Sequence, residues 1–147
     1  MPVRFQIVID AHDPVRLAEF WANALGYVPE PPPPGFATWN DYYRDLGLTE
    51  EYMVEGTDSI VDPARAGPRI WFHRVPEQKT CKNRLHFDLS VSGGRALPME
   101  TRKERVEMEV ARLAALGASR LETMEDPGVD HYAVGMMDPE GNEFDIN

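Results

Sequence analysis

Two acidic side chains near the end of the sequence are placed where they could bind a metal or transfer a proton. Glu143 and Asp145 belong to a segment, Glu143-Phe144-Asp145-Ile146, that alternates in polarity. A strand turns successive side chains to opposite faces, so both carboxylates share one face, with Phe144 and Ile146 on the other. The preceding residues, 138–142, contain Asp-Pro and Gly-Asn and are typical of a turn. On the inward face of a sheet, such a carboxylate pair could supply a metal ligand or a general base.

The elements that would hold these carboxylates follow a repeated pattern. In the first half, the same Asp-Pro turn precedes a predicted strand over 69–75. Residues 84–91 alternate in the same way as residues 4–11, and His86 occupies the place of Gln6. The chain is therefore predicted to contain an internal repeat.

A helix is predicted after the first strand of each half. In the first half, Asp13 and Pro14 are favourable residues for a helix start, and an apolar stripe continues until Gly26. In the second, a charged helix over about 100–116 carries an apolar stripe and ends at Gly117. Further strands are predicted at 59–61, 69–75, 120–123, 131–136 and 143–146.

The predicted fold class is α+β, with two βαβββ modules. Each first strand has an apolar face, which the helix must cover, and a mixed polar face that points elsewhere. Two such sheets with converging polar faces would form a central cup. The side chains predicted on the polar faces are Gln6, Val8 and Asp10; Arg69, Trp71 and His73; His86, Asp88 and Ser90; and Glu143 and Asp145. One domain is expected, with modules over about 3–76 and 83–147 and a linker over about 77–82.

The segment 31–48 interrupts the first module. Its four consecutive prolines form a stiff connector, and Trp39, Tyr42 and Tyr43 follow among acidic residues. This pattern predicts a short amphipathic helix that covers a core edge, or an aromatic flap over a cavity.

Length and charge restrict the partners. At 147 residues the chain can bury a core without disulfides or metal, and its single cysteine, Cys81, allows no internal disulfide. The formal charge of -10 argues against nucleic acid and anionic membranes, because both require a basic surface. No stretch approaches the roughly 20 apolar residues of a membrane span. A cytoplasmic protein with a small-molecule ligand is expected.

Taken together, these segments resemble the vicinal-oxygen-chelate superfamily, the group of glyoxalases, bleomycin-resistance proteins and extradiol dioxygenases. Within that superfamily, the sequence looks most similar to the glyoxalase-like proteins of no assigned reaction. The resemblance implies two βαβββ modules around a central cavity, and commonly a homodimer. The matching segments are Asp13-Pro14 through Phe20-Trp21, Leu25-Gly26-Tyr27, Arg74 to Glu77 with Lys82 to Leu89, and Asp138 to Phe144.

The resemblance also implies a ligand set for a divalent metal, namely zinc, nickel, iron or manganese. Metal enzymes of this superfamily place one ligand on the first and one on the last strand of each module. The corresponding positions here are Gln6, His86 and Asp145, while Trp71 stands at the fourth. His73, on the same strand face as Trp71, could instead join His86 and Asp145 in a set of two histidines and one carboxylate.

Two functions remain open. In the first, an enzyme acts on a small oxygenated molecule by lyase, isomerase or dioxygenase chemistry, with Asp145 as base or ligand and His86 as ligand or acid. In the second, a metal-free protein sequesters a drug or aromatic metabolite without turnover. The residues expected to line the ligand site are Trp71, Val8, Trp39, Tyr42 and Tyr43, with Glu143 either there or on the surface.

Overall fold

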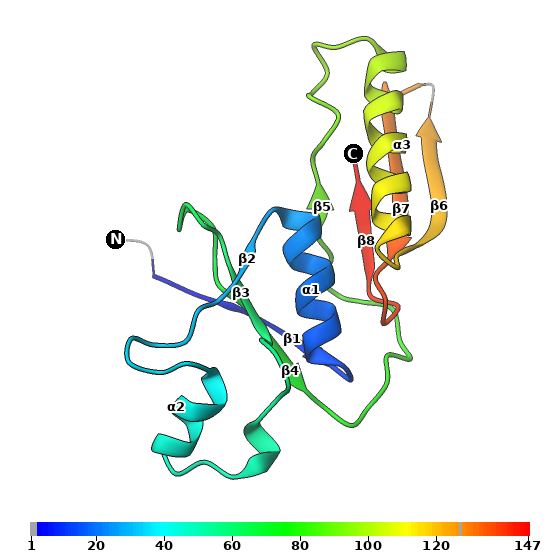
Figure 1. Ribbon diagram of the computed structural model, residues 1–147. Helices are drawn as coiled ribbons and strands as arrows, with labels where there is room; N and C mark the ends of the chain where they lie inside the picture. Colours follow the sequence, from blue (N-terminus) through cyan, green and yellow to red (C-terminus); the bar gives the residue numbers. More distant parts are fainter. Residues whose placement is uncertain (1–2, 127) are drawn as a thin grey trace. The chain divides into compact units, whose positions relative to one another are not determined.

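The computed structural model describes residues 3–126 and 128–147 (Figure 1). The chain divides into two compact units, one ending at Glu77 and the other beginning at Gln78. Each unit contains one four-stranded sheet and is considered by itself.

The first unit is built around a mixed sheet with the strand order β1-β4-β3-β2. Strands β1 and β4 are parallel, and the other pairs are antiparallel. Between β2 and β3 the chain forms a short helix and a 3-10 turn. The elements are β1 (Ile7–Ala11), α1 (Pro14–Leu25), β2 (Val28–Pro29), α2 (Trp39–Asp45), η1 (Glu50–Tyr52), β3 (Ser59–Val61) and β4 (Ile70–Arg74).

The second unit repeats this topology. Its strand order is β5-β8-β7-β6, with β5 and β8 parallel and the other pairs antiparallel. The elements are β5 (Asp88–Leu89), α3 (Met99–Ala115), β6 (Ser119–Asp126), β7 (His131–Met137) and β8 (Glu143–Ile146). Each unit is therefore a βαβββ module, which confirms the predicted α+β fold.

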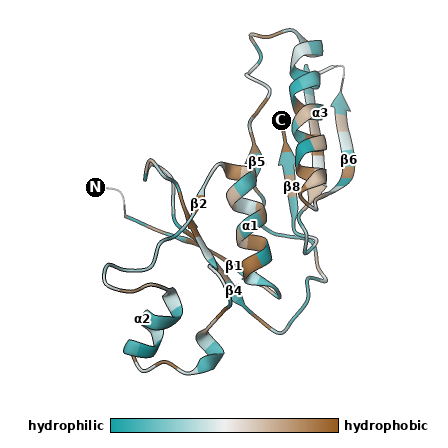
Figure 2. Ribbon diagram, in the orientation of Figure 1, coloured by the Kyte–Doolittle hydropathy of each residue, from teal (hydrophilic) through white to brown (hydrophobic). Residues whose placement is uncertain are grey.

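Each module buries one face of its sheet under its long helix. In α1, the Asp13 carboxylate accepts a hydrogen bond from the backbone N–H of Arg16, and Gly26 ends the helix with a positive φ of 68°. Figure 2 shows how strongly apolar α1 is compared with the mostly polar α2. Fully or nearly fully buried side chains form the two cores: Leu17, Phe20, Trp21, Ile60, Ile70 and Phe72 in the first module, and Val106, Leu113, Val134, Met136, Phe144 and Ile146 in the second.

Several predicted boundaries were wrong. The strand predicted over 84–91 is only Asp88–Leu89, because it is an edge strand whose one partner, β8, has four residues. His86 therefore lies just before β5. Phe5, expected under the first helix, precedes β1 and is 72% exposed. The short strand β2 was missed, and β6, predicted over 120–123, is four residues longer because it runs from Ser119 to Asp126.

The segment between β2 and β3 contains a short helix, which was one of the two alternatives predicted for it. Thr38 and Asp41 form a capping box at its start. Trp39 donates its indole N–H to the backbone oxygen of Glu30, and Asn40 exchanges hydrogen bonds with the backbone of Val54. These bonds attach α2 to the first module. Among the described residues, no helix is long and apolar enough to cross a membrane.

Candidate functional site

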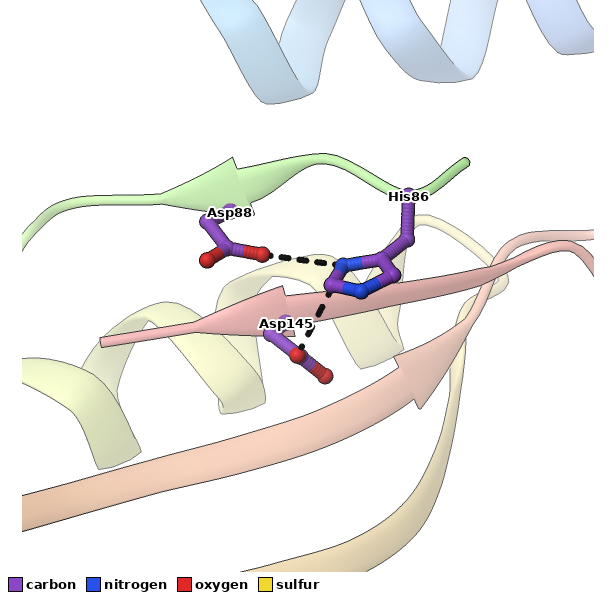
Figure 3. A group of neighbouring side chains, drawn as sticks. All are labelled: His86, Asp88 and Asp145. Carbon is purple, nitrogen blue, oxygen red and sulfur yellow. Dashed lines mark hydrogen bonds and ion pairs between the residues drawn. The ribbon is translucent and has the colours of Figure 1, made fainter. Parts of the chain in front are cut away.

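One imidazole and two carboxylates converge on the sheet of the second module (Figure 3). The Nδ1 atom of His86 lies 3.0 Å from an oxygen of Asp88 and 3.7 Å from an oxygen of Asp145. One ligand atom from each residue can be chosen so that all three lie within 4.8 Å of one another. We call these residues the His86 cluster.

The cluster follows directly from strand geometry. Asp88 and Asp145 are register partners on the adjacent parallel strands β5 and β8. His86 precedes Asp88 by two residues, the spacing at which side chains of an extended chain share a face. The backbone is extended there, since the N–H of Asp145 donates to the oxygen of Phe87 and the N–H of Asn147 to that of Leu89. Phe144 and Ile146 alternate with Asp145 and are buried on the helix side, so the cluster lies on the opposite face.

Charges of both signs act on Asp145. Burial raises the pKa of this carboxyl group, and the negative charges of Asp88 and Glu122 raise it further. His86 and Lys82 act in the opposite direction and lower it. The net effect is a raised pKa, because the site is partly desolvated and contains more carboxylates than cations.

A glycine of β7 lies next to Asp145 in the sheet. Asp145 pairs with Gly135 of β7, and Gly135 pairs with Glu122 of β6, so the row Asp88, Asp145, Gly135, Glu122 crosses the whole sheet. A Cβ atom at Gly135 would lie 3.5 Å from an Asp145 oxygen and 3.3 Å from Cγ of Glu122. The side chains of Asp145 and Glu122 are thus close enough over Gly135 that even a methyl group there would touch both.

The donor set fits a divalent cation. Metal–nitrogen and metal–oxygen bonds of about 2.0–2.2 Å allow two ligand atoms to be at most roughly 4.4 Å apart. The 4.8 Å limit of the cluster exceeds that by little, so small side-chain rotations would bring all three atoms into range. Carboxylates suit manganese and imidazole suits iron, nickel and zinc, so a mixed set accepts any of the metals expected from the sequence.

Glu143, the other carboxylate of β8, has a different environment. It accepts hydrogen bonds from the backbone N–H of Asn83, at 3.0 Å, and from the Lys79 amine, also at 3.0 Å. The Asn83 N–H, followed by Lys79, lowers the pKa of Glu143 to about 2. Glu143 thus fastens the segment 79–83 to the start of β8. The turn before it is held by the buried Asp138 carboxylate, which accepts from the backbone N–H groups of Glu140 and Asn142.

In the first module, the corresponding positions are already paired. Arg69 donates to the amide oxygen of Gln6, at 2.8 Å, and forms an ion pair with Glu30, at 2.6 Å. The indole N–H of Trp71 donates to the buried carboxylate of Asp58, at 3.1 Å. Val8 is the register partner of Trp71.

His73 lies two residues after Trp71 on β4, opposite Asp10. Its Nδ1 atom lies 3.2 Å from an oxygen of Asp10, its register partner, and its ring centre is 4.9 Å from that of Trp71. A pocket of ≈ 500 Å³ opens beside these rings. Its lining includes Trp71, His73, Tyr52, Arg74 and Val75.

The aromatic side chains of 31–48 form a separate group. Ring centres of Trp39, Tyr42 and Tyr43 lie between 5.7 and 6.0 Å apart, and Phe36 contacts Tyr42 at 5.2 Å. Burial raises the pKa of the Tyr43 hydroxyl, and Asp58 raises it further. None of these rings lines the pocket at Trp71.

Of the predicted site residues, the structure therefore brings together His86 and Asp145 in one module. In the other module, Val8 is paired with Trp71, the Trp71 ring contacts His73, and Gln6 is bound by Arg69. A set drawn from both modules, such as Gln6 or His73 with His86 and Asp145, stays a prediction. Sequence reasoning did not select Asp88 or Glu122. The spacing of Asp88 from His86 could have indicated the first of these.

Comparison with known protein families places the chain. A family model described as a glyoxalase-like domain matches residues 6–147, which includes both modules and the His86 cluster. The chain belongs to the glyoxalase-like domain family. A comparison with curated protein sequences finds no match.

Solved structures similar to this glyoxalase-like chain share its fold. One is a mutant of the fosfomycin resistance protein FosX from Listeria monocytogenes, complexed with Mn(II) and 1S,2S-dihydroxypropylphosphonic acid. It is 12% identical in sequence, with a TM-score of 0.62, and the match covers 100% of this chain and 92% of that chain. A glyoxalase/bleomycin resistance protein/dioxygenase family enzyme from Burkholderia phytofirmans PsJN is 18% identical with a TM-score of 0.56, covering 97% and 94%. A hypothetical protein from S. aureus is 16% identical with a TM-score of 0.57, covering 99% and 96%.

Proposed function

We propose that this glyoxalase-like protein is an enzyme that acts on a small oxygenated organic molecule with a divalent cation held at His86 and Asp145. The observation that carries the proposal is the convergence of one imidazole and two carboxylates within 4.8 Å on one sheet face. The Mn(II) complex of the structurally similar FosX supports a cation in this fold, although at 12% identity it does not identify the reaction.

The charges around the cluster favour cation binding. The negative charges of Asp88 and Glu122 both act on Asp145, and the positive charge of Lys82 offsets part of their effect. Like charges this close repel one another, and a bound cation would relieve that repulsion. Such a cation would supply a Lewis acid that polarises an oxygen atom of the substrate.

The chain's own residues would position the substrate and move its proton. Gly135 has no side chain to separate Asp145 from Glu122, its register partners on the two neighbouring strands. Glu122 therefore lies near the cluster but is not one of the three clustered residues. We assign it the role of proton acceptor, since Asp145 and His86 are engaged as ligands. Lyase, isomerase and dioxygenase chemistry all fit this outline.

Metal analysis tests the cation. Protein purified without chelators is expected to contain about one equivalent of manganese, iron, nickel or zinc, and the His86→Ala and Asp145→Ala variants are expected to lose it. Elemental analysis by mass spectrometry measures the content. A wild-type protein that stays metal-free after incubation with each ion would contradict the proposal.

Turnover tests the reaction. A panel of small molecules with two neighbouring oxygen atoms, including fosfomycin and its diol, is incubated with the loaded enzyme and followed by mass spectrometry. The Glu122→Gln variant is expected to keep its metal and lose turnover. If it turns over at the wild-type rate, Glu122 is not the proton acceptor.

The pocket at Trp71 supports a second candidate function, the sequestration of an aromatic ligand without turnover. It has a volume of ≈ 500 Å³ and an indole held in place by Asp58. Aromatic ligands bind by stacking and need no metal. Quenching of tryptophan fluorescence by an aromatic ligand in metal-free protein, abolished by Trp71→Leu, would favour this function.

A homodimer is also part of the proposal, because proteins of the resembled superfamily commonly pair. Analytical ultracentrifugation at micromolar concentration checks it. A sedimentation coefficient of a 16.7 kDa monomer would contradict it.

A further inference from the structure

The ligand positions that the family resemblance implies are divided between the two modules, but those of the first module are poorly suited to a cation. The amide oxygen of Gln6 accepts a hydrogen bond from Arg69, whose guanidinium also pairs with Glu30. A cation at Gln6 would therefore lie beside a fixed positive charge. The last-strand position is Trp71, whose indole has no atom that binds metals.

The second module contains a substitute for the missing ligands. Asp88 is the register partner of Asp145, just as Val8 is the register partner of Trp71. Val8 and Asp88 are thus the same position in the two modules, and only the second carries a donor atom. Figure 3 shows the carboxylates of Asp88 and Asp145 both approaching the Nδ1 edge of the His86 ring.

We infer that Asp88 is the third protein ligand of the cation, so that His86, Asp88 and Asp145 hold it within the second module alone. This inference rests on the proposed function. Three ligands from one module leave the remaining coordination positions for water or substrate oxygens, as in catalytic metal sites with an open position.

Asp88 has one competing role. Its oxygen lies 3.0 Å from Nδ1 of His86, so it could orient the imidazole while His86 binds the cation through Nε2. Carboxylates that orient a metal-binding histidine typically contribute about 10–100-fold to metal affinity. A substitution that keeps the hydrogen bond but removes the charge separates the two roles.

The Asp88→Asn variant makes that separation, because the asparagine side-chain oxygen can still accept from Nδ1–H of His86. The affinity of metal-depleted full-length protein for Mn²⁺ is measured by isothermal titration calorimetry. We expect Asp88→Asn to weaken binding by more than about 100-fold, beyond the range of an orienting carboxylate. Asp88→Glu, which restores the carboxylate, is expected to recover part of the affinity.

The first module supplies matched controls. Asp10 pairs with His73 at 3.2 Å, much as Asp88 pairs with His86, so Asp10→Asn removes an equivalent charge outside the site. Asp10→Asn and Gln6→Ala are expected to bind Mn²⁺ as tightly as the wild type. Circular dichroism and thermal unfolding in chelator check that each variant is folded.

The outcomes separate the inference from the proposed function. If the wild type binds Mn²⁺ and Asp145→Ala does not, the proposed metal site stands. Within that result, a loss below 100-fold in Asp88→Asn, or a comparable loss in Gln6→Ala, overturns the one-module site. If the wild type binds none of the cations, both proposals fall.

Discussion

The two modules have the same strand order but opposite chemistry at equivalent positions. In the first, Gln6, Val8 and Trp71 stand where the second has His86, Asp88 and Asp145. The backbone is therefore not what creates the candidate metal site. The difference lies in three side chains on the sheet face that the helix leaves uncovered.

The pairing of charges differs as well. In the first module, Arg69 neutralises Glu30 and occupies Gln6, and the buried Asp58 accepts from Trp71. In the second, burial raises the pKa of Asp145 most, Asp88 and Glu122 raise it further, and a cation could relieve this excess of negative charge. The first module pairs the charges of its polar face, while the second keeps carboxylates that repel one another and that His86 and Lys82 offset only in part.

The cores, by contrast, are equivalent, and we predict the largest effects there. The last strands contain Ile70-Trp71-Phe72 and Phe144-Asp145-Ile146, in which Trp71 and Asp145 are equivalent. The phenylalanine follows Trp71 in the first module and precedes Asp145 in the second. Phe72 and Phe144 are 0% and 1% exposed. Phe72→Ala and Phe144→Ala should each lower the free energy of unfolding by about 3–5 kcal/mol, because each leaves a cavity.

Urea denaturation followed by circular dichroism measures both losses. Phe72→Leu and Phe144→Leu, which keep most of the volume, should cost less than the alanine variants. A small loss in one module and a large loss in the other would break the equivalence of the cores.

The fold was predictable because its signals are local and periodic. The apolar stripes before Gly26 and Gly117 and the alternation over 143–146 correctly predicted two helices and β8. The edges were less predictable, because β2 and β5 have only two residues each and exist through pairing with strands distant in sequence.

The site was only partly predictable, for a related reason. The family resemblance selected His86 and Asp145, and the structure brings them together. Asp88 could have been selected from its spacing, but Glu122 could not. The pairing of β6 with β7 shifts by one residue between Arg120 and Glu122, and this irregularity decides which side chains of β6 face Asp145.

A smaller effect should distinguish the carboxylates of the two polar faces. Asp58→Ala leaves the indole N–H of Trp71 without its partner, so it should lower the free energy of unfolding by about 1–2 kcal/mol. In metal-free protein, Asp88→Ala should change it by less than about 0.5 kcal/mol, because Asp88 is exposed and is repelled by Asp145.

Thermal and urea unfolding in the presence of a chelator measure both values. The prediction concerns the difference between the variants, so each is compared with the wild type in the same buffer. Equal losses would mean that the second module, like the first, uses its carboxylate for stability.

A further small effect concerns a charge cluster of the second module, between α3 and its sheet. Arg120 donates two hydrogen bonds to Glu107, at 2.8 and 2.9 Å, and Tyr132 donates a third. Arg120 and then Tyr132 lower the pKa of Glu107 from 4.5 to about 2. Both charged side chains are 41% exposed, so solvent screens the pair. Glu107→Gln should therefore cost less than about 1 kcal/mol at pH 7.

The pH dependence of that cost follows from the direction of the shift. The folded protein holds Glu107 ionised to lower pH than the unfolded chain does, so the stabilisation is complete above pH 4.5 and disappears as the pH falls towards about 2. The difference in unfolding free energy between wild type and Glu107→Gln should shrink over that interval. Glu104→Gln, at an exposed position of the same helix, is the control. A Glu107→Gln difference that stays constant from pH 7 to pH 3 would show that the bond geometry, rather than the charge, holds α3 to this sheet.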